Sequence, residues 1–401
     1  MADRIRLLTF STLYPNAVQP RHGIFVETRL RQLLKDPMIE ARVVAPVPWF
    51  PLRASAFGRY AQYAKVARQE IRHGIEVRHP RYPVLPKIGM NLSPLLLATA
   101  CMPHLHKMIR EGYDFDLIDA HYFYPDGVAA AILGRHFKKP VVITARGTDI
   151  NLIPEYRIPR RMIRWAANNA AGLITVSSAL KEGLAGLGVN PGKITVLRNG
   201  IDLDFFRPTL RDETRAAMQI SMRLLLSVGN LVSSKGHDIA IRALSNLPDM
   251  HLNIIGEGPE KQSLQNLASS LDIADRVTFL GNLPQSELPR HYSSADALIL
   301  ASSREGWANV LLESMACGTP VVATRVGGNP EVVADPAAGQ LMDERTPEAL
   351  TDSTRKLFSN LPSRDATREY AGRFGWEETS LGQKALFEKI LTSQAFHEKL
   401  I

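Results

Sequence analysis

The sequence predicts an α/β protein of two doubly wound, parallel-sheet domains. Short apolar runs rich in β-branched residues alternate with longer segments of helical character along the chain, which is the pattern of βα units on parallel sheets. A turn-rich stretch ending in proline, residues 198–208, separates two sets of such runs and is typical of an interdomain connection. We therefore expect domains at residues 1–200 and 201–375, which suits a chain of 401 residues.

Strands are expected at each short apolar run. The runs of the first domain are Arg4–Phe10, Arg42–Val47, Ile75–His79, Asp116–His121, Pro140–Ala145, Gly172–Ser177 and Ile194–Leu197. Those of the second are Leu224–Gly229, Leu252–Gly256, Val277–Gly281, Ala297–Ala301, Val321–Thr324 and Gly339–Met342. A helix is expected over Val26–Lys35, and apolar residues at helical spacing predict another over about 376–401, which would pack back on the first domain. Ligands of both domains are expected at the carboxyl ends of the strands, in a cleft between the domains.

Composition excludes several classes of protein. The chain is 45% hydrophobic and 22% charged, which is ordinary for a soluble globular protein. Cys101 and Cys317 lie far apart and in no metal-ligand spacing, so neither a disulfide scaffold nor a zinc site is expected. The start, MADRIRLLTF, lacks the apolar stretch of a signal peptide, and the uncharged stretch 88–103 is too short and broken to span a membrane. We expect a cytoplasmic chain.

Charge is distributed unevenly between the two halves. Residues 1–200 carry 28 Lys and Arg against 14 Asp and Glu, whereas residues 201–401 carry 20 against 26. A basic half implies an anionic partner such as phospholipid, polyprenyl phosphate or nucleic acid, although no nucleic-acid motif accompanies the charge. Much of the excess lies between residues 53 and 87, at Arg53, Arg59, Lys65, Arg68, Arg72, Arg78, Arg81 and Lys87, interspersed with Phe57, Tyr60, Tyr63, Tyr82 and Leu85. This segment is either a solvated helix face or an interfacial membrane patch.

The most informative motif covers residues 303–331. Glu305 follows a predicted strand, and Glu313 comes eight residues later on a helix expected to begin near Asn309. Backbone N–H groups at such a helix start, including those of Asn309 and Val310, can receive a phosphate. The two carboxylates are suited to accept hydrogen bonds from sugar hydroxyls beside that phosphate.

Here the chain resembles the retaining nucleotide-sugar glycosyltransferases of family 4, which have the GT-B fold and a signature of two glutamates separated by seven residues. The resemblance includes the run Ala316–Pro320, the strand that follows it and the Gly327-Gly328 turn. It implies that Glu305 binds the donor sugar and Glu313 the ribose. Gly327, Gly328 and Asn329 would then supply backbone donors, although the two glycines also suit a tight turn.

A second block, residues 227–237, resembles the diphosphate-binding loop of that family. Lys235 matches the lysine of its basic pair, but Asn230 stands where the family most often has arginine. The loss of a guanidinium weakens the expected clamp on the leaving diphosphate. Arg304, Arg325 and Arg198 are open candidates for the missing charge, and a surface lysine without function is the alternative reading of Lys235. Gly256 and Gly281 follow successive strands, where the family's loops flank the base, or they only form turns.

The first half carries three further blocks. Gly23, in the loop 14–25, matches a family loop that lies against donor phosphate and acceptor. His121 ends a strand in a block with Asp126, which favours sugar binding and a catalytic role over a structural one. Arg146 replaces the histidine that the family normally has before a glycine, which points to an anionic acceptor or to a local structural exchange. Asp149, three residues on, is an accessory site residue or a helix cap.

Together these blocks predict a metal-independent hexosyltransferase, without a cofactor, that uses a nucleotide-diphosphate sugar. Lys235 and helix N-termini would stabilise the departing diphosphate, and no carboxylate cluster is placed for a divalent ion. The acceptor is expected to be a glycan or a polyprenyl-linked glycan in bacterial polysaccharide or glycoconjugate biosynthesis, at the inner face of the membrane. The alternatives are an epimerase or hydrolase of the same architecture and a non-catalytic protein that binds nucleotide sugars.

Overall fold

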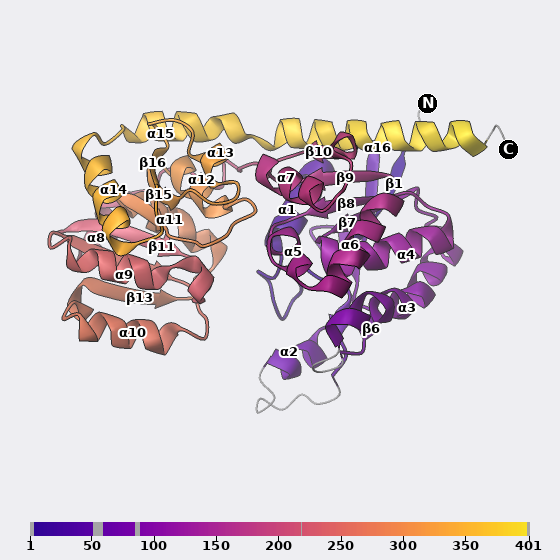
Figure 1. The fold of residues 1–401 in the computed structure, drawn as a ribbon, viewed down its shortest axis with the longest axis horizontal. Coiled ribbons are helices and arrows are strands. Elements are labelled where there is room, and N and C mark those ends of the chain that lie inside the picture. The colour runs from indigo at the N-terminus through magenta and orange to yellow at the C-terminus, as the bar shows by residue number, and fades with distance from the viewer. Residues whose placement is uncertain (1–3, 51–58, 85–88, 218, 399–401) are drawn as a thin grey trace. The chain divides into compact units, whose positions relative to one another are not determined.

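The computed structural model describes residues 4–50, 59–84, 89–217 and 219–398. The chain divides into two compact units, which are described one at a time (Figure 1). Unit 1 comprises Met1–Arg198 and Glu377–Ile401, and unit 2 comprises Asn199–Trp376.

Unit 1 contains an eight-stranded sheet in the order β10-β9-β8-β7-β1-β2-β5-β4. The strands are β1 (Ile5–Phe10), β2 (Ile39–Val44), β4 (Gln69–Arg72), β5 (Ile75–Arg78), β7 (Leu117–His121), β8 (Val141–Ala145), β9 (Gly172–Thr175) and β10 (Ile194–Val196). All pair in parallel except β4 with β5. The strands β7 and β8 are buried along their whole length, as expected for the centre of a parallel sheet covered on both faces.

The antiparallel strand β4 was not expected from the sequence. A two-residue turn joins it to β5, and both turn residues, His73 and Gly74, have positive φ, at 49° and 81°. That geometry reverses the chain tightly and makes a hairpin at the sheet edge. The strand is polar apart from Ile71, which is 76% exposed, so no apolar run marks it in the sequence. The expected strand Arg42–Val47 also ends early, at Val44, and β3 (Val47–Pro48) pairs with β6 (Arg81–Tyr82) in a small separate sheet.

Helices cover both faces of the unit 1 sheet (Figure 1). They are α1 (Ile24–Leu33), α2 (Arg59–Lys65), α3 (Gly89–Arg110), α4 (Val128–Phe137), α5 (Thr148–Asn151), α6 (Arg157–Asn169), α7 (Ser178–Gly186) and α16 (Trp376–Glu398). The terminal helix α16 packs Phe387, which is fully buried, with Ile5, Leu117 and Ile174 of the sheet. The last segment of the chain thus completes the core of unit 1.

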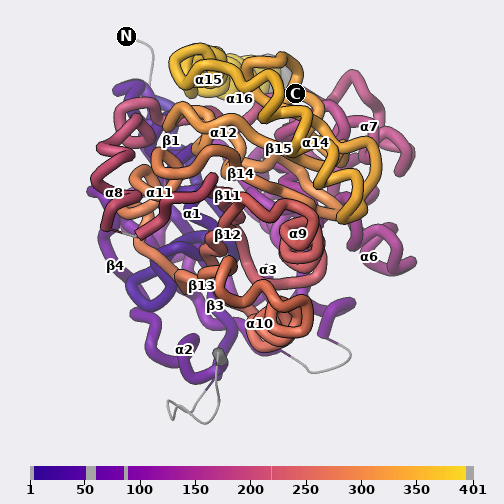
Figure 2. The backbone as a smooth tube through the Cα atoms, turned by 90° about the vertical axis from the view of Figure 1, so that its left-hand side faces the viewer, coloured from indigo at the N-terminus to yellow at the C-terminus, as the bar shows by residue number. Residues whose placement is uncertain are grey.

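Unit 2 contains a six-stranded sheet in the order β13-β12-β11-β14-β15-β16, parallel throughout. The strands are β11 (Arg223–Val228), β12 (Met250–Ile255), β13 (Val277–Gly281), β14 (Ala297–Leu300), β15 (Val321–Thr324) and β16 (Gly339–Met342). The helices are α8 (Arg211–Ala217), α9 (His237–Ser245), α10 (Lys261–Ser270), α11 (Leu288–Ser294), α12 (Asn309–Ala316), α13 (Asn329–Val332), α14 (Pro347–Ser359) and α15 (Arg364–Ala371). Figure 2 shows α9 and α10 beside strands β12 and β13.

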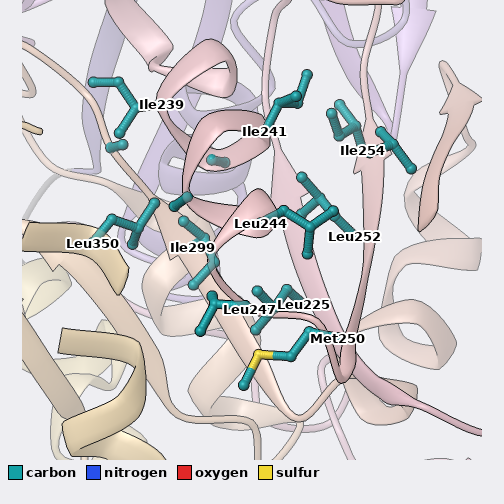
Figure 3. Packing of buried hydrophobic residues seen from close by; sticks show 14 of the residues in the cluster. Leu225, Ile239, Ile241, Leu244, Leu247, Met250, Leu252, Ile254, Ile299 and Leu350 are labelled. Atoms are coloured by element: carbon teal, nitrogen blue, oxygen red, sulfur yellow. The ribbon is translucent and has the colours of Figure 1, made fainter. Parts of the chain in front are cut away.

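The core of unit 2 lies between this sheet and the helices α9, α10 and α14. Its apolar residues follow helical spacing on α9, as at Ile241 and Leu244, and alternate along β12, as at Leu252 and Ile254. Figure 3 shows these side chains packed together. These are the periods expected of a helix and of a strand that bury one face against the core. The predicted fold class, two mainly parallel α/β sheets, is confirmed.

The basic segment 53–87 is not one helix. Within the described residues 59–84 it forms α2, β4, β5 and β6, while Arg53, Phe57, Leu85 and Lys87 lie outside the described residues. Two of its basic side chains form ion pairs within unit 1. Arg72 pairs with Glu27 at 2.7 Å, and Arg78 pairs with Glu76 at 2.6 Å. The reading as a single solvated helix face is therefore wrong, because the segment forms a helix and three strands, and the reading as a membrane patch stays a prediction. No helix in the described part of the chain is long and apolar enough to cross a membrane.

Candidate functional site

The main candidate site lies in unit 2, where the strand order reverses. Strand β11 is central, with β12 on one side and β14 on the other, so the loops that follow β11 and β14 leave the sheet in opposite directions. Ligands of open α/β sheets bind at such a switch point. The loop after β11 carries Lys235, at the end of a single 3₁₀ turn, and the loop after β14 carries Glu305.

Lys235 and Glu305 form an ion pair. Lys235 Nζ lies 2.6 Å from Glu305 Oε1, and Ser302 Oγ donates to the same oxygen at 2.7 Å. The lysine side chain is 29% exposed and the glutamate side chain 10% exposed. A lysine and a carboxylate predicted to contact the diphosphate and the sugar therefore lie together at the carboxyl edge of the sheet, partly open to solvent.

Backbone contacts hold the two loops against each other. Ser303 N donates to Ser234 O at 2.8 Å. Arg345 joins both loops, because its Nε donates to Ala301 O at 2.8 Å and its Nη2 to Ser233 O at 2.9 Å. Sequence reasoning did not identify Arg345, which lies far along the chain in no recognisable motif. Arg345 thereby holds together the two loops that carry the ion pair.

The glycine turns predicted around the site are required by close approach. A Cβ on Gly327 would lie 1.9 Å from Glu305 O, and one on Gly256 would lie 1.8 Å from Gly229 O. Each distance is far below van der Waals contact, so only glycine fits without moving the neighbouring loop. Gly256 N also donates to the carbonyl of Gly281, the last residue of β13, at 2.8 Å. The loops after four strands are thus packed directly against one another.

Glu313 is on α12, where the sequence placed it. Its Oε2 accepts a hydrogen bond from the Tyr292 hydroxyl at 2.7 Å. Burial raises the pKa of Glu313 to about 7, and the Tyr292 hydrogen bond only partly opposes that rise. Hydroxyl donors from a ligand would stabilise the charged form of this carboxyl and so lower its pKa. Tyr292 was not predicted, since it precedes the motif on a different helix.

The start of α12 is anchored to the segment that enters unit 2. Asn309 Oδ1 accepts from Asn199 Nδ2 at 3.2 Å, and Trp307 Nε1 donates to Asn199 O at 3.1 Å. No side chain caps this helix. The backbone N–H groups of Asn309 and Val310 are therefore in the first turn of an uncapped helix, as the anion-binding hypothesis needs.

Asn230, where an arginine was expected, takes part in the loop through its backbone. Its carbonyl oxygen lies 3.2 Å from His237 Nε2, and its side chain is exposed. His237 Nδ1 lies 2.9 Å from Ser227 Oγ. Burial lowers the pKa of His237 to about 4, so the ring is neutral at pH 7. His237 is a structural histidine of this loop that the sequence analysis did not single out.

The three arginines considered as replacements differ in their surroundings. Arg325 pairs with Asp343 at 3.3 Å, and Arg198 belongs to unit 1, where it contacts Ser178. Arg304 is exposed, directly before Glu305 in the chain, and forms no ion pair with any described residue. Of the three, Arg304 is the one in unit 2 whose charge is not already paired.

Contacts of Asn329 close the turn after β15. Asn329 is fully buried, its Nδ2 donates to Thr324 O at 3.0 Å, and its backbone N–H donates to Val326 O at 3.1 Å. The backbone N–H of Asn329 thus closes the turn itself, and its role as a donor to the diphosphate or sugar stays a prediction. Gly328 precedes α13 as its N-terminal cap residue.

In unit 1, His121 and Arg146 are brought together. His121 ends β7 and is 1% exposed. Its Nδ1 lies 2.6 Å from Arg146 Nη2, and its Nε2 lies 3.2 Å from Asp119 Oδ2. Burial lowers the pKa of His121 to about 4, and the charge of Arg146 acts in the same direction, whereas Asp119 opposes it. Both ring nitrogens of His121 are thus in contact with side chains of unit 1, Arg146 and Asp119.

Asp126 and Asp149 are fully buried and bound to the protein. Asp126 accepts from the backbone N–H of Thr12 at 2.7 Å, and burial raises its pKa to about 7. Asp149 accepts from the backbone N–H groups of Phe123 and Gly147, both at 2.7 Å. These contacts favour the structural reading of Asp149, as the residue that shapes the turn beside Arg146. Gly23 is the N-terminal cap of α1 and has a φ of 69°.

Metal ligands are not clustered in the described ranges, which hold no group of three or more His, Cys, Asp or Glu side chains able to bind an ion.

Comparisons with known proteins support the resemblance on which these assignments rest. Residues 211–374 match the family model described as Glycosyl transferases group 1, and residues 58–205 match the one described as Glycosyltransferase Family 4. A GDP-mannose-dependent alpha-(1-6)-phosphatidylinositol monomannoside mannosyltransferase of Mycolicibacterium smegmatis is 30% identical over 315 residues, covering 74% of this chain and 78% of that enzyme.

A second relative and a solved structure extend the comparison. A D-inositol 3-phosphate glycosyltransferase of Mycolicibacterium gilvum is 37% identical over 200 residues, but the match spans only 47% of this chain and 45% of that enzyme. A structure of sucrose-phosphate synthase from Thermosynechococcus elongatus has a TM-score of 0.79 and 18% identity, and it covers 97% of this chain and 100% of that one. At this identity the likeness concerns the fold.

Proposed function

The chain belongs to glycosyltransferase family 4, and on that basis we propose that it is a retaining enzyme that moves a sugar from a nucleotide-diphosphate donor to a glycan or lipid-linked acceptor. The observation that carries the proposal is the Lys235–Glu305 pair, 2.6 Å apart at the switch point of unit 2. A cation and a carboxylate side by side match a substrate that has a diphosphate next to a sugar.

The proposed chemistry divides the groups of unit 2 by what they contact. Lys235 takes the negative charge that develops on the departing diphosphate, and the uncapped start of α12 adds backbone donors. Glu305 accepts from the donor sugar hydroxyls, and Glu313 accepts from the ribose. Arg304, adjacent to Glu305 and unpaired within the described residues, supplies the second positive charge that Asn230 lacks. No protein nucleophile is assigned.

The acceptor side is proposed to rest on an anionic bilayer through α6 and the start of α3. The exposed arginines Arg157, Arg160, Arg161 and Arg164 of α6 form no ion pair with described residues, and this helix contains no acidic residue. Beside them Tyr156 is 54% exposed and Ile158 is 46% exposed. A basic helix with exposed apolar side chains suits the headgroup region of an anionic membrane.

The start of α3 extends this surface. Met90, Leu92 and Leu95 are 37%, 40% and 48% exposed. Tyr124 joins the two helices, because its hydroxyl donates to Met90 O and lies 4.0 Å from Met162 Sδ of α6. We place the proposed membrane contact of unit 1 on this α3–α6 surface, because the arginines of α6 form no ion pair with described residues.

Analysis of reaction products tests the proposed activity. The chain is incubated with UDP-, GDP- and ADP-sugars, with and without lipid-linked acceptors from a bacterial membrane extract. Acceptor-dependent release of the nucleotide with sugar incorporated into the extract is expected, and Glu305→Gln should abolish it. Release without incorporation would favour a hydrolase, conversion of the donor sugar an epimerase, and binding without turnover a non-catalytic protein.

A further inference from the structure

We propose that Gln383, on the terminal helix α16, is a positioning residue that fixes the protonation form of His121. Gln383 is 1% exposed and lies more than 250 residues along the chain from the strand that carries His121. Because α16 returns to unit 1 after the whole of unit 2, the group reaches this site only through the fold. Any effect of Gln383 on catalysis rests on the function proposed above. Its effect on the protonation form of the His121 ring does not depend on that function.

The hydrogen bonds around His121 permit only one tautomer. A guanidinium can only donate, so Arg146 Nη2, at 2.6 Å, requires His121 Nδ1 to be an unprotonated acceptor. The proton of the neutral ring is then on Nε2, which donates to Asp119 Oδ2 at 3.2 Å. An imidazolium would place a proton on Nδ1 against Arg146.

Gln383 completes this chain of contacts from the other side of Asp119. Its Nε2 donates to Asp119 Oδ2 at 3.0 Å, and its Oε1 accepts from Arg29 Nε at 2.7 Å. The two contacts fix the orientation of the amide, because only the oxygen can face the guanidinium. Asp119 Oδ2 therefore receives one donor from the ring and one from Gln383, and its position relative to the ring is set by α16.

The charges of the cluster explain why the amide matters. Burial lowers the pKa of Arg29 to about 10 and that of Arg146 to about 9, so both guanidiniums remain charged at neutral pH. Burial would raise the pKa of Asp119, but His121, Arg29 and Arg146 outweigh it and lower it. The carboxylate is the negative charge nearest the ring, and the Gln383 donor offsets part of it. Without that donor, Asp119 would favour an imidazolium more strongly.

The test is a titration of the full chain labelled with ¹⁵N-histidine, followed by two-bond ¹H–¹⁵N spectra. His121→Gln identifies the signals of the ring. The wild type is expected to show a neutral, Nε2-protonated ring from pH 8 down to about pH 5. In Gln383→Met the midpoint should rise by one pH unit or more, and in Gln383→Glu it should rise further, because a carboxylate adds negative charge and cannot donate to Asp119.

A matched control separates positioning from docking of the helix. Lys384→Met removes the ion pair between Lys384 and Asp36, 2.5 Å long, on the same helix without touching the cluster. Its His121 titration should equal that of the wild type. An Nδ1-protonated ring in the wild type, an unchanged midpoint in folded Gln383 variants, or an equal shift in Lys384→Met would each overturn the proposal. If Gln383→Met does not fold, the Gln383→Glu titration decides by the same criterion.

Discussion

Glu313 provides a test at the scale of a single residue, because its pKa of about 7 lies far above that of an ordinary carboxyl. Ribose hydroxyls would stabilise its charged form, so donor binding should release a proton and strengthen as pH rises towards 7, by up to tenfold per pH unit. Calorimetric titration with an intact nucleotide sugar measures this, since a free diphosphate itself titrates near pH 6. Glu313→Gln should bind with no such slope, and a slope that persists in this variant would contradict the assignment.

The same raised pKa has a consequence for stability. A carboxyl whose pKa is raised on folding stabilises the protein below its unfolded pKa, and that contribution is lost as pH rises through about 7. Relative to the wild type, Glu313→Gln should therefore gain stability between pH 5 and pH 8. Chemical denaturation at the two pH values measures the difference, and an equal difference at both would show that folding does not raise the pKa of Glu313.

Lys235→Ala tests the leaving-group role. Removal of one electrostatic donor to a developing charge costs about 2–4 kcal/mol, so turnover should fall about 30- to 1000-fold. Lys261→Ala is a matched control, since Lys261 forms an exposed ion pair with Glu257 at 2.9 Å in the same unit. Turnover that is nearly normal in Lys235→Ala, or equally reduced in both variants, would show that Lys235 is not part of the machinery.

Individual residues also show where sequence reasoning reaches its limit. Lys235, Glu305 and the Gly327 turn were predicted because each lies in a local block that resembles a motif of the family. Arg345 and Tyr292 were missed, since they act through single contacts made by tertiary packing. His121 was placed at its strand end correctly, but nothing in the sequence shows that Asp119 and Arg146 occupy both of its ring nitrogens.

At the scale of elements, the α3–α6 surface makes a prediction about membranes. Each basic residue near an anionic bilayer contributes about 1 kcal/mol, so Arg157→Gln, Arg160→Gln and Arg161→Gln together should weaken binding to anionic vesicles about 100-fold. Leu92→Ser with Leu95→Ser should weaken it at high salt as well, because apolar burial is not screened. Flotation with phosphatidylglycerol and phosphatidylcholine vesicles at low and high salt measures both effects.

A control with the same change in charge makes this test specific. Three exposed basic residues of unit 2, Arg242, Arg290 and Lys356, are changed to Gln together. Their loss should leave flotation unchanged. Equal losses of vesicle binding in both triple variants would show that only the net charge of the chain matters. Binding to a soluble polyanion without binding to vesicles would exclude a membrane partner.

Strands were easier to predict than the pieces between them. Strands β13, β15 and β16 have the predicted bounds, and β15, which is buried along its whole length, reads as a short apolar run. The hairpin β4–β5 was missed because β4 is a short edge strand with a single apolar residue, and its turn, His73-Gly74, is not one of the commonest hairpin pairs. The arginines at residues 72 and 78 looked available in the sequence, but their partners come from distant elements.

At the scale of the whole molecule, the absence of a metal requirement is a prediction of its own. Lys235 and the start of α12 are proposed to stabilise the leaving diphosphate without a divalent ion. Turnover of the full chain in EDTA should therefore equal turnover without it, once adventitious ions are removed. Loss of activity in EDTA and its recovery with Mg²⁺ or Mn²⁺ would contradict this part of the mechanism.

The central claim is that unit 2 binds a nucleotide-diphosphate sugar through Lys235, Glu305 and Glu313. Thermal unfolding of the full chain with UDP, GDP, ADP and their sugars tests it most directly, because it needs no acceptor. A ligand at a hundred times its dissociation constant should stabilise the protein by about 2.7 kcal/mol. One nucleotide series is expected to give this stabilisation in the wild type and to lose most of it in Lys235→Ala and Glu313→Ala. Stabilisation by none of the series, or equal stabilisation of the wild type and both variants, would contradict the claim.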